Sequence, residues 1–274
     1  MRRGIMPIAG SRIEDIERVR CAKRPITISP ALRSFRRRAV GARIAKLGRS
    51  GKRVLVHLDT GDVIVFEPRM TGLVLLAAPP TRDHLRFRIK LAGGRHKELL
   101  YWDRRGLGSV RLLSADELET LYGEKKLGPD ALALDAAGLR KRLASSRRAI
   151  KVALLDQRAV AGIGNLYAAE ILHLARVHPE LGCDQLTPAQ WKRLAAATHE
   201  VLKSAIRYEG STLSDGTYRN ALNKDGGYQN KHRVYARAGK RCPTCGRGTI
   251  ERIVQAQRAT FFCPVCQKRA VSKE

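Results

Sequence analysis

Short apolar runs separated by turn residues dominate the first 113 residues of the chain. Between about residues 43 and 76 the runs are 54–56, 63–66 and 73–76, and turn signals such as Asp59-Thr60-Gly61-Asp62 separate them. Apolar runs of this length, bounded by Gly and Asp, are typical of β-strands. Residues 85–91 and 99–102 are further predicted strands. The sequence therefore predicts an antiparallel sheet and a β-rich domain over residues 1–113.

Helical spacing of apolar residues replaces this pattern after residue 113, at 114–122, 139–143 and 149–155. Thr187-Pro188-Ala189-Gln190 is a capping box with Pro at the first helical position, and it predicts a helix through about Ile206. The segment 210–227 is rich in Gly, Ser, Thr and Asn, which predicts a mobile loop. We expect an α+β chain with a β-rich domain (1–113), a helical domain (114–230) and a C-terminal ribbon (231–274).

The composition is that of a globular, strongly basic protein. The chain has 274 residues, of which 43% are hydrophobic, and this is ample for a core. No run approaches the roughly 18 apolar residues of a membrane span, and the first residues lack a signal-peptide core. We therefore expect a cytoplasmic location and no membrane partner. The 53 Lys and Arg outnumber 25 Asp and Glu along the whole chain, so phosphate is the expected counter-charge, although charge does not choose between DNA and RNA.

Four cysteines form two C-x-x-C pairs separated by 17 residues. They are Cys242, Cys245, Cys263 and Cys266. Pairs of thiolates on tight turns present a tetrahedral ligand set to one structural Zn²⁺, which folds a segment too short to bury its own core. The alternative is a pair of disulfides, which the absence of a secretory signal disfavours. Cys21 and Cys183 lie far from the array and receive no role.

A glycine turn, Gly162-Ile163-Gly164-Asn165, separates two predicted helices. Two glycines let the backbone approach a ligand closely, and the amides that begin the second helix form a phosphate-sized anion site together with Asn165. For an isolated Gly-x-Gly, a helix-helix corner that binds nothing is the preferred interpretation, because turns use Gly everywhere. The residues around the turn decide between these two interpretations.

Together with the stretch from Gln255 to Cys263 (Gln-Ala-Gln-Arg-Ala-Thr-Phe-Phe-Cys), the glycine turn closely resembles the formamidopyrimidine-DNA glycosylase family, which includes the endonuclease eight branch. The resemblance extends over nearly the whole chain. Further matching segments are residues 51–52, 70–72, 83–84, 103–108, 127–130 and 234–237. The resemblance implies a β-sandwich-like domain, a helical domain with a helix-two-turn-helix, a zinc ribbon, and DNA bound in the cleft between the domains.

The function implied by the resemblance is base-excision repair. Such enzymes evert oxidised purines, 8-oxoguanine and formamidopyrimidines, from damaged double-stranded DNA and cut the glycosidic bond. They then nick the abasic site by β,δ-elimination through a Schiff base. This chemistry needs no redox or nucleotide cofactor. We expect a monomer associated with the nucleoid and active without added magnesium.

The resemblance assigns void-filling positions to Met70, Arg105 and Leu107. Eversion leaves a hole in the base stack, and an inserted apolar or planar side chain recovers part of the unstacking cost of a few kcal/mol. Without the resemblance, Met70 would be assigned to the core. Leu107 stands where the glycosylase branch has Phe, and Gly106 stands where it has a second Arg. Both departures affect the expected lesion spectrum and opposite-base preference.

Two basic residues match catalytic positions of the family. Lys52 matches the lysine beside the scission site, where an ammonium stabilises charge or passes a proton. Arg258 matches the arginine that grips the phosphates flanking the lesion, and its planar fork suits bidentate contact. The other positions matched to DNA contacts are His84, Arg104, Arg105, Arg147, Lys151 and Asn165.

The family's opening, Pro-Glu-Leu-Pro-Glu-Val-Glu, does not precede Arg2-Arg3-Gly4 in this sequence. Its N-terminal proline is the nucleophile, because a terminal amine with a pKa near 8 is neutral more readily than a lysine with a pKa of about 10.4. Either Met1 is an internal methionine of a longer protein that has this Pro and Glu, or the chain is short. We expect the first, because every later motif is intact.

Two alternatives to an active glycosylase follow from the same observations. A chain without the nucleophile would be a catalytically inactive member that binds damaged DNA. Charge and ribbon alone also fit a zinc-ribbon RNA-binding protein, although the glycine turn and the matches at Met70 and Arg105 disfavour it.

Overall fold

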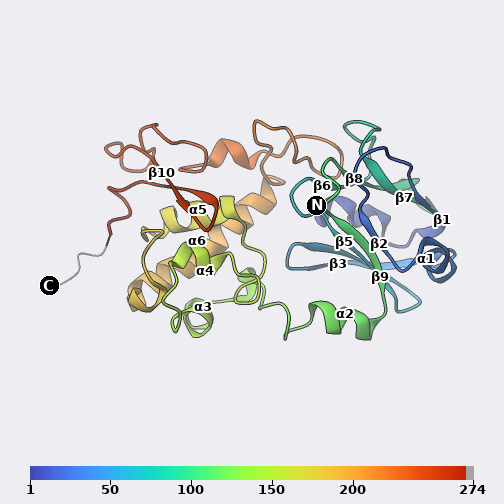
Figure 1. Cartoon of the computed structure of the whole chain (residues 1–274), viewed down its shortest axis with the longest axis horizontal. Coiled ribbons are helices and arrows are strands. Elements are labelled where there is room, and N and C mark those ends of the chain that lie inside the picture. Colours follow the sequence, from blue (N-terminus) through green and yellow to red (C-terminus); the bar gives the residue numbers. More distant parts are fainter. Residues whose placement is uncertain (270–274) are drawn as a thin grey trace. The chain divides into compact units, whose positions relative to one another are not determined.

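The computed structural model describes residues 1–269, which form two compact units (Figure 1). The first unit contains Met1–Gly123 and Tyr208–Gln229, and the second contains Glu124–Arg207 and the chain from Asn230 onward. The segment Tyr208–Gln229 thus belongs to the β-rich unit. The expected domain boundaries place it in the helical domain, 114–230. Residues 270–274 of the predicted ribbon lie outside the described residues.

Two sheets build the first unit. The four-stranded sheet has the order β1 (Arg12–Arg18), β7 (Leu85–Ala92), β8 (Glu98–Asp103) and β6 (Gly72–Leu75). The five-stranded sheet has the order β2 (Thr27–Ser29), β9 (Ser109–Leu113), β5 (Val63–Glu67), β4 (Arg53–Leu58) and β3 (Ile44–Ser50). All neighbours are antiparallel except β2 and β9, which are parallel. The predicted strands are confirmed, but the run at 73–76 belongs to a different sheet from the runs at 54–56 and 63–66.

The core of the first unit lies between the two sheets, as the β-sandwich-like prediction requires. Phe66 of β5 meets Tyr101 of β8 and Phe87 of β7, with ring centroids 5.7 and 6.5 Å apart. Phe35 from helix α1 (Leu32–Ala39) packs on Phe87 at 5.4 Å. Aromatic pairs at these distances add to the stability that their burial supplies.

Two further segments complete this core. The 3₁₀ turn η1 (Arg3–Ile8) buries Ile5 and Ile8 completely. Ala221, from the segment Tyr208–Gln229, is buried in the same cluster, and its carbonyl accepts a hydrogen bond of 2.7 Å from the backbone N–H of Leu76. This pairing holds the Gly-rich segment against the first unit. Helix α2 (Ala115–Tyr122) follows β9 and begins at a capping box formed by Ser114.

Four helices and a hairpin build the second unit. They are α3 (Ala136–Leu143), α4 (Ile150–Leu154), α5 (Asn165–Leu174), α6 (Pro188–Arg207), β10 (Glu251–Gln255) and β11 (Arg258–Phe262). Short 3₁₀ turns are η2 (Ala131–Ala133), η3 (Cys183–Gln185) and η4 (Tyr228–Lys231). The hairpin lies beside α5 (Figure 1). None of the helices in residues 1–269 has the length and apolar character needed to span a membrane.

The predicted helices of this unit are confirmed, and the capping box at α6 forms as expected. The Thr187 backbone N–H donates to Gln190 Oε1 at 2.8 Å, and the Gln190 N–H donates to Thr187 Oγ1 at 3.3 Å. These two bonds satisfy backbone donors at the start of the helix.

Candidate nucleic-acid interface and metal centre

The four cysteines of the ribbon meet at one point. Their sulfur atoms all lie within 4.8 Å of one another, with Cys242 Sγ 3.9 Å from Cys266 Sγ and Cys245 Sγ 3.8 Å from Cys263 Sγ. Zn–S bonds of about 2.3 Å in a tetrahedron place the sulfurs about 3.8 Å apart, so this donor set fits Zn²⁺. Backbone N–H groups of Gly248 and Arg247 lower the pKa of Cys245 to about 6, whereas burial raises the pKa of Cys263 and of Cys266. A metal ion binds the thiolate form of these groups.

The metal centre is fastened to helix α5 by a buried polar network. Gln267 Oε1 accepts from the Cys263 N–H at 3.0 Å, and Gln267 Nε2 donates to the carbonyl of Val177 at 2.8 Å. His173, on α5, places Nδ1 3.1 Å from Gln267 Oε1 and Nε2 2.8 Å from Thr244 Oγ1. Four thiolates and these anchors make a closed, structural metal site.

Glu170 fixes the segment that leads into the ribbon. Its carboxylate is fully buried in α5 and accepts hydrogen bonds from three consecutive backbone N–H groups, those of Arg233, Val234 and Tyr235, at 2.8 to 3.0 Å. A buried carboxylate is tolerated only when such donors surround it. The sequence around Glu170 does not reveal this role, because the partners of the carboxylate lie more than 60 positions away along the chain.

Lys151 joins the glycine turn to the ribbon hairpin. Its side chain is fully buried, and Nζ donates to Asn165 Oδ1 at 2.7 Å, to Thr260 Oγ1 at 2.7 Å and to the carbonyl of Ala259 at 3.3 Å. Asn165 Nδ2 donates to the same carbonyl at 3.0 Å. The sequence placed Lys151 at a phosphate-facing position, but its ammonium is enclosed and its three hydrogens are all used inside the second unit.

The buried ammonium of Lys151 predicts a specific pH dependence of stability. Burial, and secondly the charge of Arg258, lower the pKa of Lys151 from near 10.5 to about 8. Between these values the unfolded chain binds more protons than the folded one, so this group makes the free energy of unfolding rise with pH. We expect Lys151→Met to reduce that rise between pH 8 and 10, measured by urea unfolding. Lys192→Met, on the exposed face of α6, is the control, and equal pH slopes in the two variants would contradict the prediction.

Arg258 stands beside the tight turn of the hairpin. The two turn residues, Ala256 and Gln257, have φ of +46° and +60°, the left-handed conformation of a two-residue hairpin turn. Neither is glycine, so the turn is strained, and strain of this kind concentrates at functional sites. The Arg258 side chain is exposed, and Ala259, next along β11, is the residue that Lys151 and Asn165 hold.

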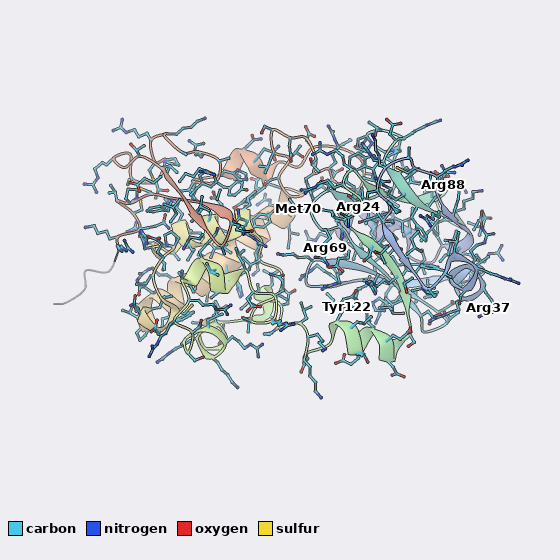
Figure 2. All side chains as sticks on the ribbon, in the orientation of Figure 1. Arg24, Arg37, Arg69, Met70, Arg88 and Tyr122 are labelled. Atoms are coloured by element: carbon cyan, nitrogen blue, oxygen red, sulfur yellow. The ribbon has the colours of Figure 1, made fainter. Side chains whose placement is uncertain are left out.

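Met70 and Arg105 come together in the first unit. Met70 is 70% exposed, and Arg105 Nη1 lies 3.3 Å from its sulfur. Arg69, which precedes it, has φ of +52°, and Arg69 Nε lies 3.2 Å from Glu67 Oε1 at the end of β5. Arg69 and Met70 lie at the margin of the first unit (Figure 2). A single exposed apolar side chain is common on protein surfaces and contributes nothing to the core. The contact with Arg105 is what distinguishes Met70 from the other exposed apolar residues.

The loop that carries Arg105 is organised by Asp103. This carboxylate is fully buried, and its oxygens accept from Thr71 Oγ1 at 2.5 Å, from the Arg105 N–H at 3.1 Å and from the Gly108 N–H at 2.8 Å. One side chain therefore fixes both the Met70 turn and the Arg105 loop. Leu107 is half-buried and Arg104 is exposed.

Gly106 explains one departure from the family pattern. Its φ is +62°, and a Cβ atom at this position would collide with the carbonyl oxygen of Arg24. The close approach of the chain around Arg24 thus leaves no room for the second arginine of the glycosylase branch.

The remaining candidates occupy loops and turns. Lys52 is exposed in the two-residue turn between β3 and β4, where Gly51 has φ of +55°. His84 is half-buried, with its ring edge-on to Trp102 at 5.4 Å. Arg147 is exposed ahead of α4. The matched residues of the first unit are Lys52, Met70, His84, Arg104, Arg105 and Leu107. Those of the second unit are Arg147, Lys151, Asn165 and Arg258.

Comparison with known proteins covers all three parts of the chain. Residues 1–110 match the family described as Formamidopyrimidine-DNA glycosylase N-terminal domain, residues 127–217 its H2TH domain, and residues 239–269 the zinc finger found in FPG and IleRS. Formamidopyrimidine-DNA glycosylase of Chloroflexus aurantiacus is 41% identical over 89% of this chain and 86% of that protein, and that of Thermus thermophilus is 37% identical over 93% and 97%.

Solved structures agree with these sequence matches. The complex of Lactococcus lactis Fpg with DNA containing an abasic site has a TM-score of 0.85 at 32% identity, covering 98% of this chain and 97% of that one. The MutM (Fpg) protein from Thermus thermophilus has a TM-score of 0.81 at 34% identity, covering 96% and 94%. With the cysteine centre, the glycine turn and these matches along its length, the chain belongs to the formamidopyrimidine-DNA glycosylase family.

Proposed function

We propose that the protein is a base-excision repair glycosylase that removes oxidised purines from double-stranded DNA and nicks the resulting abasic site. The observation that carries this proposal is the exposed Met70 in contact with Arg105, on loops fixed by the buried Asp103. An apolar side chain beside a guanidinium suits a gap in a base stack. The Met70 side chain packs on the neighbouring bases, and the Arg105 guanidinium stacks on a base or forms hydrogen bonds with it.

The proposed residue roles combine the positions matched to the family with the exposure and charge of each side chain. Met70, Arg105 and Leu107 enter the space left by the everted nucleotide. Exposed cations, Lys52 and Arg258 foremost, hold the phosphates around the lesion, and His84, Arg104 and Arg147 extend the contact. Lys151 and Asn165 position the hairpin that presents Arg258. Zn²⁺, held by the four cysteines, folds this hairpin and takes no part in the reaction.

The reaction we propose is amine catalysis. A neutral amine attacks C1′ of the lesion sugar, and the base leaves with a proton. The C1′–O4′ bond then breaks, O4′ takes a proton, and an imine forms between the amine and C1′. Loss of the C2′ proton expels the 3′ phosphate, and loss of the C4′ proton then expels the 5′ phosphate. The ammonium of Lys52 stabilises phosphate charge or passes a proton during these eliminations. A net charge of +28 supports residence on undamaged DNA between events, so we place the protein on the nucleoid.

Borohydride trapping on a duplex with one 8-oxoguanine tests the function. The 274-residue chain is compared with a chain that carries Pro-Glu-Leu-Pro-Glu-Val-Glu-Thr ahead of Met1. We expect the extended chain to form a covalent adduct, because a reducible imine joins enzyme and sugar. Lesion binding by both chains without any adduct would instead make the protein a reader of damaged DNA, and preference for structured RNA would exclude both activities.

Arg258→Ala is expected to lower the salt dependence of DNA binding. Each phosphate contact releases counterions and contributes about 0.9 to the slope of log affinity against log salt concentration. The measurement is fluorescence anisotropy of a lesion duplex at several salt concentrations. Arg252→Ala is the matched control, since Arg252 is an exposed arginine on the partner strand β10. An unchanged slope for Arg258→Ala would remove this residue from the phosphate contacts.

A further inference from the structure

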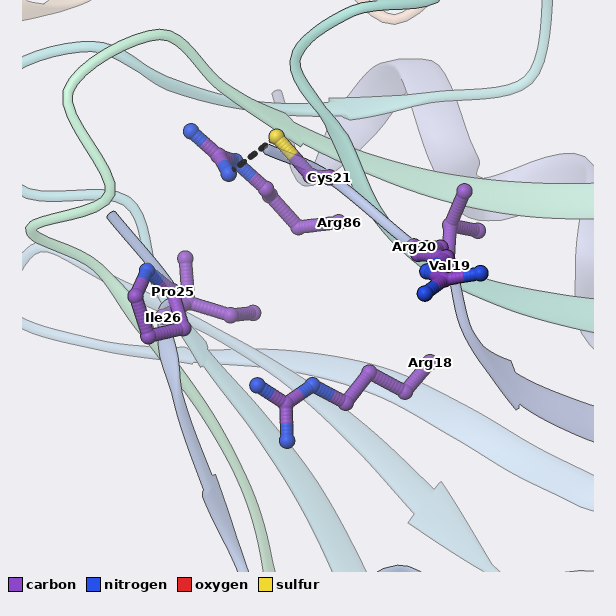
Figure 3. Close-up of a pocket in the computed structure, with 7 residues that line it drawn as sticks. All are labelled: Arg18, Val19, Arg20, Cys21, Pro25, Ile26 and Arg86. Atoms are coloured by element: carbon purple, nitrogen blue, oxygen red, sulfur yellow. Dashed lines mark hydrogen bonds between the residues drawn. The ribbon is translucent and has the colours of Figure 1, made fainter. Parts of the chain in front are cut away.

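A small cavity in the first unit lies outside all the candidate positions described above. Its volume is about 260 Å³, and its wall combines three arginines, Arg18, Arg20 and Arg86, with Cys21 and the apolar Val19 and Ile26 (Figure 3). It lies where strand β1 ends, the chain runs on to β2, and strand β7 begins. The residues that line it include no acid. A cavity with this lining has a positive potential and no internal counter-charge.

Arg86 supplies the feature that points to a ligand. Its side chain is only 2% exposed. Nε donates to the carbonyl of Asp103 at 2.9 Å, and Nη1 contacts Cys21 Sγ and lies 3.4 Å from the carbonyl of Lys23. Nη2 is buried and has no hydrogen-bond partner within the described residues 1–269, and no ion pair to Arg86 occurs there. The guanidinium is therefore buried, has no ion-pair partner within 4.0 Å among residues 1–269, and leaves Nη2 without an acceptor.

Such an arrangement is costly unless something else supplies the missing acceptor. A buried charge is ordinarily paired, and a buried donor is ordinarily hydrogen-bonded. An oxyanion in the cavity would accept from Nη2 and neutralise the guanidinium, whose planar fork matches oxyanion geometry. The volume falls just below the range of about 300–1,000 Å³ that is usual for pockets of larger organic ligands. The occupant is therefore small.

We infer that this cavity is a binding site for a small oxyanion of the phosphate class, with Arg86 as the buried donor and Arg18 and Arg20 at the exposed side. The site adds to the proposed glycosylase activity and does not depend on it. Arg86 also holds the carbonyl of Asp103, whose carboxylate holds the Arg105 N–H. A bound anion therefore lies one hydrogen-bonded residue away from the loop that carries Arg105.

The test uses Cys21 as a local reporter, because its sulfur contacts Arg86 inside the cavity. The intact protein is alkylated with the neutral reagent iodoacetamide at constant ionic strength, in inorganic phosphate or in chloride, and the Cys21 peptide is quantified by mass spectrometry. Free glutathione in the same tube corrects for effects on the reagent. We expect phosphate to slow Cys21 alkylation saturably, whereas chloride leaves it unchanged.

Variants at the exposed side keep the test independent of folding, since replacing the buried Arg86 risks misfolding. The double variant Arg18→Gln, Arg20→Gln is expected to raise the phosphate concentration for half-protection by about tenfold, because it removes hydrogen bonds between charged groups and the anion. Arg37→Gln, an exposed arginine on α1, is the control and leaves it unchanged.

A second arm distinguishes the source of the phosphate. Undamaged duplex DNA replaces the inorganic anion in the same assay. Protection by phosphate but not by duplex identifies a site for a free oxyanion, and protection by duplex that the double variant abolishes identifies a DNA backbone phosphate. Protection by neither ligand, or equal protection of the wild type and the double variant, overturns the inference.

Discussion

Cys263→Ser is expected to release the zinc ion and to lower the affinity for lesion DNA at least tenfold, about 1.4 kcal/mol. Cys263 is fully buried, its sulfur is one of four within 4.8 Å, and its backbone N–H is held by Gln267. Structural zinc contributes about 10–16 kcal/mol to the folding of small zinc modules, so a three-ligand site loses much of the ribbon's stability. Arg258 would then lose the hairpin that presents it.

The measurement pairs zinc content by atomic absorption with anisotropy on a lesion duplex. Cys21→Ser makes the same chemical change outside the metal centre, and it should retain both the zinc and the affinity. The second unit should also lose thermal stability, because the network of Gln267 and His173 joins the ribbon to α5. A metal-free Cys263→Ser protein with unchanged affinity would show that the ribbon is not part of the DNA contact.

The strands predicted from the sequence have apolar runs or, in β7, strict alternation of apolar and basic residues. Strand β1 shows why others were missed. Residues 12–18 read Arg-Ile-Glu-Asp-Ile-Glu-Arg, and the two buried residues, Ile13 and Ile16, are three positions apart. A bulge between Ile13 and Asp15 shifts the register, so both isoleucines face the core although strict alternation would separate them. Helix α1 was missed for another reason: it has only eight residues, four of them arginine.

Some residues of the candidate site can be predicted from local sequence spacing, whereas others depend on contacts between distant parts of the chain. Local spacing predicts the cysteine centre, because two C-x-x-C turns already carry half of the ligand geometry each. The enclosure of Lys151 depends on Thr260, which lies 109 positions away along the chain. Arg86 lines a cavity only because the fold brings β7 next to the chain around Cys21. A pattern of residue types along the chain contains neither contact.

Met70→Ala is expected to slow excision of 8-oxoguanine from duplex DNA by roughly tenfold while leaving the fold intact. Met70 is 70% exposed, and surface substitutions of this kind change stability by only about 0.5 kcal/mol or less. The inserted side chain recovers part of the few kcal/mol that unstacking costs, and about 1.4 kcal/mol of that recovery corresponds to a tenfold rate.

Single-turnover excision measures the rate, and thermal unfolding measures the stability, of the Met70→Ala variant. Both use the form of the protein that gives the covalent adduct with borohydride. Val40→Ala, which removes an exposed apolar side chain elsewhere in the first unit, should leave the rate unchanged. A single-stranded substrate separates void filling from other roles, because its lesion is already unstacked and needs no filler. We therefore expect the deficit of Met70→Ala to shrink on single strands. An equal deficit on both substrates would assign Met70 to contact with the lesion itself, and no deficit on either would leave its exposure without a function.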